Sequence, residues 1–389
     1  MKKDVTSSVN KRSRNPHKVY QRKVKLMLAI TCLSVFTACV TIVLSVLVCI
    51  RFKYAGQSTV TFAEQDAGQA VDQLNQNGDE VTEAFSDSVY SQAEVDALME
   101  AARENASAQG EAEVLDTLQK RLMNGEGSLD IYRDLYPDYV VLVDSGKYHF
   151  IEKNESLSAN RFDNEKFLLG EDGLLSYQDE QTDTYMGIDV SKYQGKIDWE
   201  KVKNAGVDFA IVRAGIRGYS EGAILGDDTF ADNVEGAKQQ GIALGTYFFT
   251  QATSEEEAVE EAQFVIDRLK EAEVSLEYPV YLDVEAVSSA NCRTKDLTQE
   301  QRTKFAKVFL EKIEEAGFQP ALYGNMKTYM LMLDITELEE YDKWLASYSL
   351  PIYYPYDFQI LQYSEKGRIP GISEPVDLNI CFKKYGGED

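Results

Sequence analysis

The chain has 389 residues, more than one typical domain requires, and its 44% hydrophobic and 27% charged residues are typical of globular proteins. It carries 65 acidic against 40 basic residues, a formal net charge of −25, which argues against general binding to nucleic acid. Its two histidines are His17 and His149, so the chain after His149 can hold neither a Ser-His-Asp triad nor a His-ligated catalytic zinc.

The N-terminal part combines a basic segment with a long apolar one. Residues 1–25 hold nine Lys or Arg and one acid, a charge of +8, so the remaining chain carries −33. Residues 26–50 are uncharged, and 25 residues at ~1.5 Å each can span a hydrocarbon core of ~30 Å. We predict a basic cytoplasmic tail, a single transmembrane helix and an extracellular remainder, because the positive charge precedes the apolar run. A cleaved signal peptide is the alternative, but its apolar region is normally about 7–15 residues.

Cysteine usage fits this division of the chain. Three cysteines fall within residues 26–50, where cysteine acts as a small apolar residue. Cys292 and Cys381 lie beyond them. In an oxidising compartment these two could form a disulfide, and two separate buried thiols are the equal alternative.

The next part of the chain changes from polar to patterned sequence. Residues 54–90 are rich in Ala, Gln, Asp, Glu and Ser, which predicts a solvated extracellular stalk. Residues 91–124 have apolar residues at helical spacing. Residues 139–151 contain two apolar runs around the turn at 144–147, which predicts a β-hairpin. We therefore expect a small α+β domain over residues 91–176.

The C-terminal part, residues 178–389, alternates between strand and helix patterns. Capping-box patterns at 254–257 and 298–301 mark the starts of two helices. This pattern predicts an α/β fold, an irregular TIM-like β/α barrel of parallel type, with its chemistry at the C-terminal ends of the strands. The eight candidate strands are 187–190, 209–214, 243–249, 279–284, 321–323, 344–346, 359–363 and 376–380.

Carboxylates stand at several of these strand ends. Asp283 and Glu285 end the fourth strand and point to the same side, because side chains alternate along a strand. Asp189 ends the first strand, and Asp377 begins the eighth. Two adjacent carboxylates repel, so one stays protonated near neutral pH. A protonated acid beside an ionised one is what a glycosidase requires.

Other interpretations of these acids remain open at this point. Asp283 and Glu285 could cap neighbouring loops or pair with Arg213, a purely structural role. Clustered carboxylates also suit hard cations such as Mg²⁺ or Ca²⁺. We expect no metal and no cofactor, because the chain has no glycine-rich phosphate loop and histidine is scarce.

The barrel region resembles glycoside hydrolase family 25, the bacterial and phage muramidases. The resemblance begins with GIDVSKYQG at 187–195 followed by IDW at 197–199, and it extends over residues 186–383. Each motif alone is weak, but their common order is specific. The later motifs are FAIVRA at 209–214, GTYFF at 245–249, LDVE at 282–285, LY at 322–323, WLASY at 344–348, QY at 362–363 and VDLN at 376–379.

The resemblance implies a β/α barrel that cleaves the β-1,4 bond between N-acetylmuramic acid and N-acetylglucosamine in peptidoglycan. It implies that Glu285 is the general acid/base and that Asp283 assists, either by orienting the substrate acetamido group or at the anomeric carbon. Asp189 and Asp377 would complete the acidic floor. The implied substrate-binding residues are Arg213, Tyr247, Tyr323, Trp344, Tyr348, Gln362 and Tyr363.

Two positions depart from the family pattern. Many members have His where Phe248 stands and Trp where Leu361 stands. We expect the missing ring at 361 to alter one sugar subsite. Neither departure removes a proposed catalytic carboxylate.

The leading hypothesis is therefore a membrane-anchored peptidoglycan hydrolase that remodels or locally opens the cell wall. Its expected partners are peptidoglycan strands, the lipid bilayer through residues 26–50, and a wall-associated protein for residues 54–176. The alternative is a non-catalytic barrel that binds glycan or scaffolds a wall-spanning machine. A wall amidase or endopeptidase is disfavoured, since residues 178–389 contain no histidine.

Overall fold

A computed structural model describes residues 92–386 of the chain. The predicted basic tail, transmembrane helix at 26–50 and stalk at 54–90 lie outside this range. Among the described residues, no helix is both long and apolar enough to cross a membrane. The chain divides into two compact units, residues 1–117 and 118–389, which are described separately.

Helix α4 (Gln92–Met123) runs from the first unit into the second and confirms the helix predicted at 91–124. It ends just before Gly125, whose φ of 82° favours glycine. In the second unit, Arg121 contacts Glu126 and Asp134, both at 2.6 Å. These ion pairs hold the end of α4 against the chain that follows it.

The predicted hairpin is present, preceded by a short helix. Helix α5 (Ser128–Leu135) packs on strand β1 (Tyr139–Asp144), and its Tyr132 ring contacts Tyr148 and Phe150 of strand β2 (Lys147–Glu152). The strands pair antiparallel around Ser145 and Gly146, which both have positive φ, the geometry of a tight hairpin turn.

A second small hairpin, β3 (Phe167–Leu169) with β4 (Leu175–Tyr177), lies just before the barrel. Phe162, which precedes it, is buried with its ring 4.1 Å from that of Phe382 and 4.9 Å from that of Phe358. Residues 157–177 therefore contribute side chains to the barrel's own hydrophobic core.

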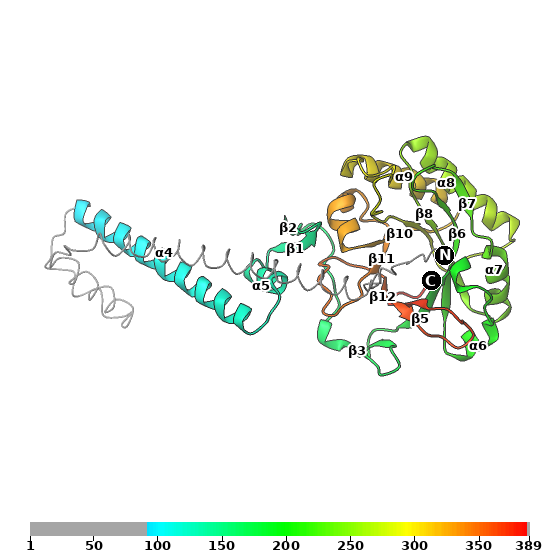
Figure 1. Cartoon of the computed structure of the whole chain (residues 1–389), viewed down its shortest axis with the longest axis horizontal. Helices are drawn as coiled ribbons and strands as arrows, with labels where there is room; N and C mark the ends of the chain where they lie inside the picture. Colours follow the sequence, from blue (N-terminus) through cyan, green and yellow to red (C-terminus); the bar gives the residue numbers. More distant parts are fainter. Residues whose placement is uncertain (1–91, 387–389) are drawn as a thin grey trace, which may run out of the picture. The chain divides into compact units, whose positions relative to one another are not determined.

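The barrel has the eight strands that the sequence predicts (Figure 1). The ring runs β5-β13-β12-β11-β10-β9-β8-β6 and closes through the pairing of β5 with β6. A short strand, β7 (Ile224–Gly226), adds to β6 outside the ring. The barrel strands are β5 (Tyr185–Val190), β6 (Phe209–Arg217), β8 (Ala243–Phe249), β9 (Val280–Asp283), β10 (Pro320–Asn325), β11 (Asp342–Ala346), β12 (Ile360–Gly367) and β13 (Val376–Cys381).

The expectation of a parallel barrel is wrong for its last strand. β13 pairs antiparallel with both β12 and β5, whereas the other pairs in the ring are parallel. The chain reaches β13 from β12 through a short connection, which permits an antiparallel neighbour without a crossover. The start of β13 therefore meets the C-terminal ends of the other strands, and Asp377 lies opposite Asp189.

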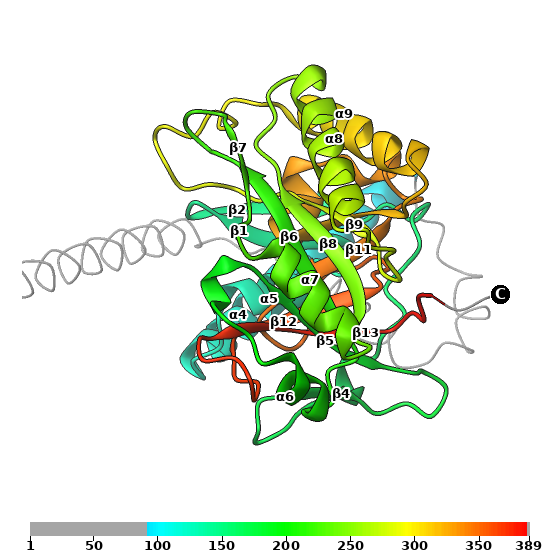
Figure 2. The same ribbon diagram turned by 90° about the vertical axis from the view of Figure 1, so that its right-hand side faces the viewer.

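Helices cover the outside of the barrel, with α7, α8 and α9 prominent in Figure 2. The box predicted at 298–301 forms in full, with Thr298 and Gln301 capping each other's backbone N–H. The box predicted at 254–257 forms only in part. The Ser254 side chain caps the Glu257 N–H, but the Glu257 carboxylate accepts hydrogen bonds from Thr253 and not from the Ser254 backbone. The helices are α6 (Trp199–Asn204), α7 (Phe230–Gln239), α8 (Glu255–Glu271), α9 (Gln299–Glu315) and the short η1 (Asn164–Lys166), η2 (Lys192–Gln194), η3 (Thr328–Met332) and η4 (Ile335–Glu337).

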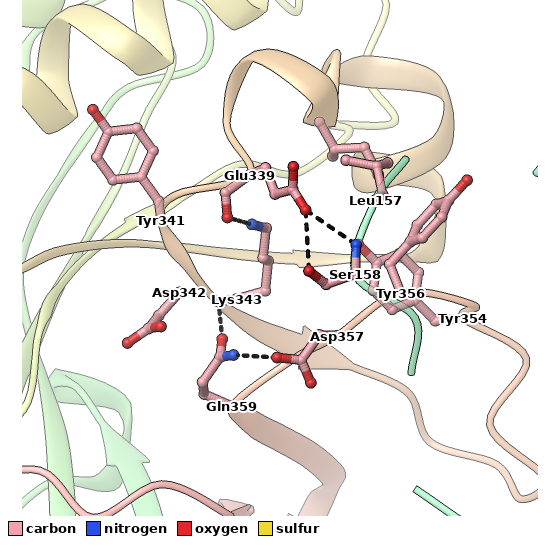
Figure 3. A pocket seen from close by; sticks show the side chains of 11 residues that line it. Leu157, Ser158, Glu339, Tyr341, Asp342, Lys343, Tyr354, Tyr356, Asp357 and Gln359 are labelled. Atoms are coloured by element: carbon pink, nitrogen blue, oxygen red, sulfur yellow. Dashed lines mark hydrogen bonds between the residues drawn. The ribbon is translucent and has the colours of Figure 1, made fainter. Parts of the chain in front are cut away.

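The segment before β3 also contacts the long connection between β11 and β12. Asn160 donates to the Pro355 and Tyr354 carbonyls. Figure 3 shows Ser158 bound to the Glu339 carboxylate, beside Lys343, whose ammonium donates to the Glu339 carbonyl at 2.7 Å. These bonds fasten the pre-barrel segment to the barrel.

Cys292 and Cys381 are separate buried thiols rather than a disulfide. Cys292 donates to Gln251 Oε1 at 3.5 Å, and Cys381 donates to the Lys383 carbonyl at 3.1 Å. Of the two alternatives left open by the sequence, the structure has two thiols.

Candidate active site

A cavity of about 210 Å³ opens where the barrel strands end. The walls are carboxylic acids and aromatic side chains, carried by residues at strand ends or in the connections that follow. The residues that line it are Asp189, Tyr247, Asp283, Glu285, Tyr323, Trp344, Tyr348, Gln362, Glu365 and Asp377. The four predicted carboxylates are thus brought together from strands β5, β9 and β13, with Glu285 two residues after the end of β9.

Asp283 and Glu285 form the first acidic pair. Asp283 is the last residue of β9 and is 5% exposed, while Val284 turns into the hydrophobic core as predicted. Burial, followed by the neighbouring Glu285, raises the pKa of Asp283 well above its usual range. Burial also raises the pKa of Glu285, which accepts a hydrogen bond from Asp283. The pair therefore retains a proton near neutral pH.

Asp189 and Asp377 form the second acidic pair. Burial raises the pKa of Asp377 to about 9, and the adjacent Asp189 contributes. Burial also raises the pKa of Asp189, although hydrogen bonds from Asn379, Gln362 and Asp377 oppose the rise. Asp377 therefore holds a proton and donates it to Asp189.

Two amide side chains hold Asp189 in place. Its Oδ2 accepts from Gln362 Nε2 at 2.9 Å and from Asn379 Nδ2 at 2.8 Å. Asn379 Oδ1 in turn accepts from Trp344 Nε1 at 2.7 Å. Each amide has its oxygen occupied, so its N–H group must point at the carboxylate.

The aromatic residues divide into a floor and a rim. Trp344 is 1% exposed and makes edge contacts with Tyr247, Tyr281 and Tyr323 at centroid distances of 6.1, 5.1 and 4.4 Å. Tyr348 is 52% exposed, and its hydroxyl donates to Gln362 Oε1 at 2.7 Å. Tyr348 therefore has a free ring face for a sugar, whereas Trp344 supports the floor.

Two predicted binding residues do not line this cavity. Arg213 binds Asp227 through Nε at 2.8 Å and Nη2 at 2.6 Å, and it is not the partner of Asp283. Its charge still favours the ionised form of Asp283, so it acts at a distance. Tyr363 points away from the cavity because it follows Gln362 on a strand, and it packs against the hydrophobic core.

The departures at 248 and 361 are also away from the cavity. Phe248 and Leu361 are fully buried in the hydrophobic core. The expectation that Leu361 alters a sugar subsite is therefore wrong, because its strand neighbour Gln362 occupies the cavity-facing position.

Sequence reasoning missed two members of the site. Asn379 is two residues after Asp377 on β13, so it shares that face, and this spacing could have identified it. Glu365 follows an irregularity in the β12–β13 pairing, which no sequence pattern indicates. Among residues 92–386, no cluster of three or more His, Cys, Asp or Glu has the geometry of a metal site.

Comparison with known proteins gives a family match over most of the barrel. Residues 188–372 match the family model described as Glycosyl hydrolases family 25. The chain is 29% identical over 206 residues to the uncharacterized protein YegX of Escherichia coli K12, covering 51% of this chain and 69% of that one. It is 27% identical over 194 residues to the autolytic lysozyme of Clostridium acetobutylicum, covering 50% and 54%.

Among solved structures, the chain is similar to the modular autolysin LytC of Streptococcus pneumoniae, solved with a synthetic peptidoglycan ligand. The TM-score is 0.48 at 23% identity, covering 62% of this chain and 51% of that one. The chain thus spans about half the length of this autolysin and of the Clostridium lysozyme.

Proposed function

Residues 188–372 form a glycosyl hydrolase family 25 domain, and from this premise we propose that the chain is a membrane-anchored peptidoglycan hydrolase. We propose that it cleaves the β-1,4 bond between N-acetylmuramic acid and N-acetylglucosamine. The observation that carries the proposal is the placement of Asp283 and Glu285 side by side in one cavity with aromatic walls, where burial raises the pKa of both. A site that only binds glycan does not need such a pair.

The proposed roles follow from the position of each acid. Glu285 is half-buried at the cavity wall, where it can reach a bound glycosidic oxygen, whereas Asp283 lies deeper. Glu285 takes the shared proton from Asp283 and donates it to the leaving oxygen. Asp283 is then ionised and stabilises the positive charge that develops at the anomeric carbon, directly or through the substrate acetamido group. Glu285 later accepts a proton from the incoming water.

The second pair prepares the site rather than transferring the proton. Asp377 keeps its proton and Asp189 is held by two amides, so the floor carries about one negative charge instead of two. That charge lies beside the position where positive charge develops. Fixed dipoles and charges of this kind require no reorganisation during the reaction.

The test is product analysis with the full chain and purified peptidoglycan. We expect new reducing ends from the parent chain, and a fall in rate of about 10²–10⁴-fold in Glu285→Gln, because the general acid is lost. Glu374→Gln, an exposed position before β13, is the matched control and should retain full activity. New free amines without reducing ends, or full activity in Glu285→Gln, would contradict the proposal. Binding without any cleavage by the parent would instead indicate a scaffold.

The proposed location is the cell membrane, with the N-terminus cytoplasmic and the barrel extracellular. It is supported by the +8 charge of residues 1–25 followed by 25 uncharged residues. Protease added to intact, wall-stripped cells should degrade the barrel and spare the N-terminal tail. A barrel protected until the membrane is permeabilised would reverse the proposed orientation.

A further inference from the structure

A second cavity, about 390 Å³, lies between the β1–β2 hairpin and the barrel. Arg133, Tyr139 and Lys153 line it from the α5 and hairpin side, and Met326 and Tyr353 line it from the barrel. The hairpin side is outside the family 25 match at 188–372. This cavity is therefore a feature added to the family domain.

The second cavity is lined from the barrel by residues close in sequence to the lining of the catalytic cavity. Tyr353 is five residues after Tyr348, and Met326 is three residues after Tyr323. These spacings keep the paired Cα atoms within about 18 Å and about 11 Å of each other. The hairpin is fastened at this edge by Lys327, whose ammonium lies 2.6 Å from the Asp144 carboxylate. The two cavities therefore lie within the reach of one extended polymer.

The chemistry of the second cavity suits an anionic ligand with flat faces. The Arg133 guanidinium lies 3.5 Å from the centre of the Tyr353 ring, and its Nε donates to the Val141 carbonyl. Lys153 is exposed and is held by the Pro137 carbonyl at 2.6 Å. A stacked, positioned guanidinium and an ammonium group are donors suited to carboxylates.

One acid, Asp134, also lines the cavity, and Asp130 binds Arg133 beside it; both acids are engaged in ion pairs. Asp130 lies 3.3 Å from Arg133 Nη1, and the Asp134 carboxylate lies 2.6 Å from Arg121. Lys153 is not among the ion pairs of the described residues, so its charge remains available at the rim. Among the charged residues at this cavity, Lys153 is therefore the one whose charge is not taken up by an ion pair of the described residues.

Half-exposed aromatic rings extend from the second cavity along the hairpin. Tyr139 lies 6.0 Å from Tyr136, which lies 4.9 Å from Phe150, and each ring is 38–45% exposed. The ring centroid of Tyr132 lies 5.9 Å from that of Phe150 and 5.1 Å from that of Tyr148. Aromatic faces of this kind bind the apolar faces of sugar rings or peptides.

We propose that the second cavity is a subsite for the peptidoglycan strand that binds a stem-peptide carboxylate. Arg133 and Lys153 take the carboxylate, and Tyr139 and Tyr353 contact the adjoining sugar or peptide. The occupant is the substrate rather than a protein, because Met326 and Tyr353 lie within three and five residues of Tyr323 and Tyr348 in the catalytic cavity. The subsite would make cleavage depend on stem peptides, and this inference rests on the proposed function.

The experiment measures binding by the full chain carrying Glu285→Gln, so that no ligand is consumed. It is titrated with soluble peptidoglycan strands that either bear stem peptides or have been stripped of them by an amidase. We expect Lys153→Glu to weaken binding of the peptide-bearing strands about fivefold and to leave the stripped strands unaffected. Tyr353→Ala should weaken the binding of both the peptide-bearing and the stripped strands, because it removes an aromatic ring face.

Lys238→Glu is the matched control, since Lys238 is also an exposed lysine held by a backbone carbonyl, that of Glu273 on the barrel's outer layer. Unchanged thermal unfolding of each variant separates binding from folding. Equal affinity of Lys153→Glu and its parent for peptide-bearing strands would overturn the inference, as would equal losses on both ligands. Failure of the proposed function is visible separately, as an absence of new reducing ends from the chain with Glu285 intact.

Discussion

Gln362 donates a 2.9 Å hydrogen bond to the buried Asp189 carboxylate from an amide that cannot turn over. Its oxygen already accepts from the hydroxyl groups of Tyr323 at 2.9 Å and Tyr348 at 2.7 Å. A rotation of the amide would place oxygen against carboxylate and leave both hydroxyl groups facing N–H groups. The rim tyrosine and the buried acid are therefore connected through one fixed side chain.

Gln362→Leu should lower the free energy of unfolding by roughly 1–3 kcal/mol, because the buried Tyr323 hydroxyl loses its acceptor and Asp189 loses a donor. Denaturant unfolding measures the change. Gln178→Leu removes an amide that binds only exposed Ser176, and it should have little effect. Equal stabilities for the two variants would show that the amide does not support the site.

Asp377→Asn should stabilise the protein increasingly as pH rises. The folded pKa of about 9 exceeds the usual value, so the folded chain keeps a proton that the unfolded chain loses above about pH 4. The parent therefore loses stability as pH rises from about 4 to 9, while asparagine stays neutral. Thermal unfolding at pH 5 and pH 8 should show a larger gain at pH 8; a pH-independent difference would contradict the shared proton.

Phe162→Ala should cost about 3–5 kcal/mol of stability, although Phe162 lies outside the family match. Its ring is 8% exposed and contacts Phe382 and Phe358 of the barrel. Leu168→Ala, at a position 52% exposed on β3, is the control and should change little. If the two variants unfold alike, the pre-barrel segment is not part of the barrel's folding unit.

Arg217→Met should destabilise the protein by roughly 3–5 kcal/mol at pH 8, because buried Glu261 loses the guanidinium 2.7 Å away. Burial already raises the pKa of Glu261 to about 7, and removing Arg217 raises it further. At pH 5 the carboxyl is protonated with or without Arg217, so the cost should be smaller there. Chemical denaturation at both pH values measures the difference.

Lys304→Met is the control for this pair, because it breaks an exposed ion pair between Lys304 and Glu255 of α8. The effect of that change should be small and should depend little on pH. A loss of stability in Arg217→Met that is as large at pH 5 as at pH 8 would mean that the lost packing of Arg217, and not the charge of Glu261, causes it.

Local sequence was sufficient for the strands and for most of the acidic site. Alternation over short apolar runs located the eight barrel strands, and the same alternation placed Asp283 and Glu285 together with Val284 turned away. Capping at Thr298 and the turn at Gly146 were equally local. In each case the physical cause of the local structure lies in a few residues that are neighbours in the sequence.

The alternation of side chains along a strand was insufficient to predict contacts where a side chain had several possible partners in distant parts of the chain. From local sequence, Arg213 could have paired with the acids of the site. In the structure it binds Asp227 instead, whose side chain is fully buried and would otherwise lack a countercharge. Tyr363 follows a cavity residue and therefore faces the opposite layer.

The sequence by itself determined the family resemblance of the barrel region, the strands and the candidate carboxylates, because these depend on residue type and local periodicity. Only the tertiary structure decided the direction of β13, which brings Asp377 to Asp189, and the packing of Phe162 into the barrel. Strand direction and such long-range contacts depend on which distant surfaces bury one another, and this is a property of the whole folded chain.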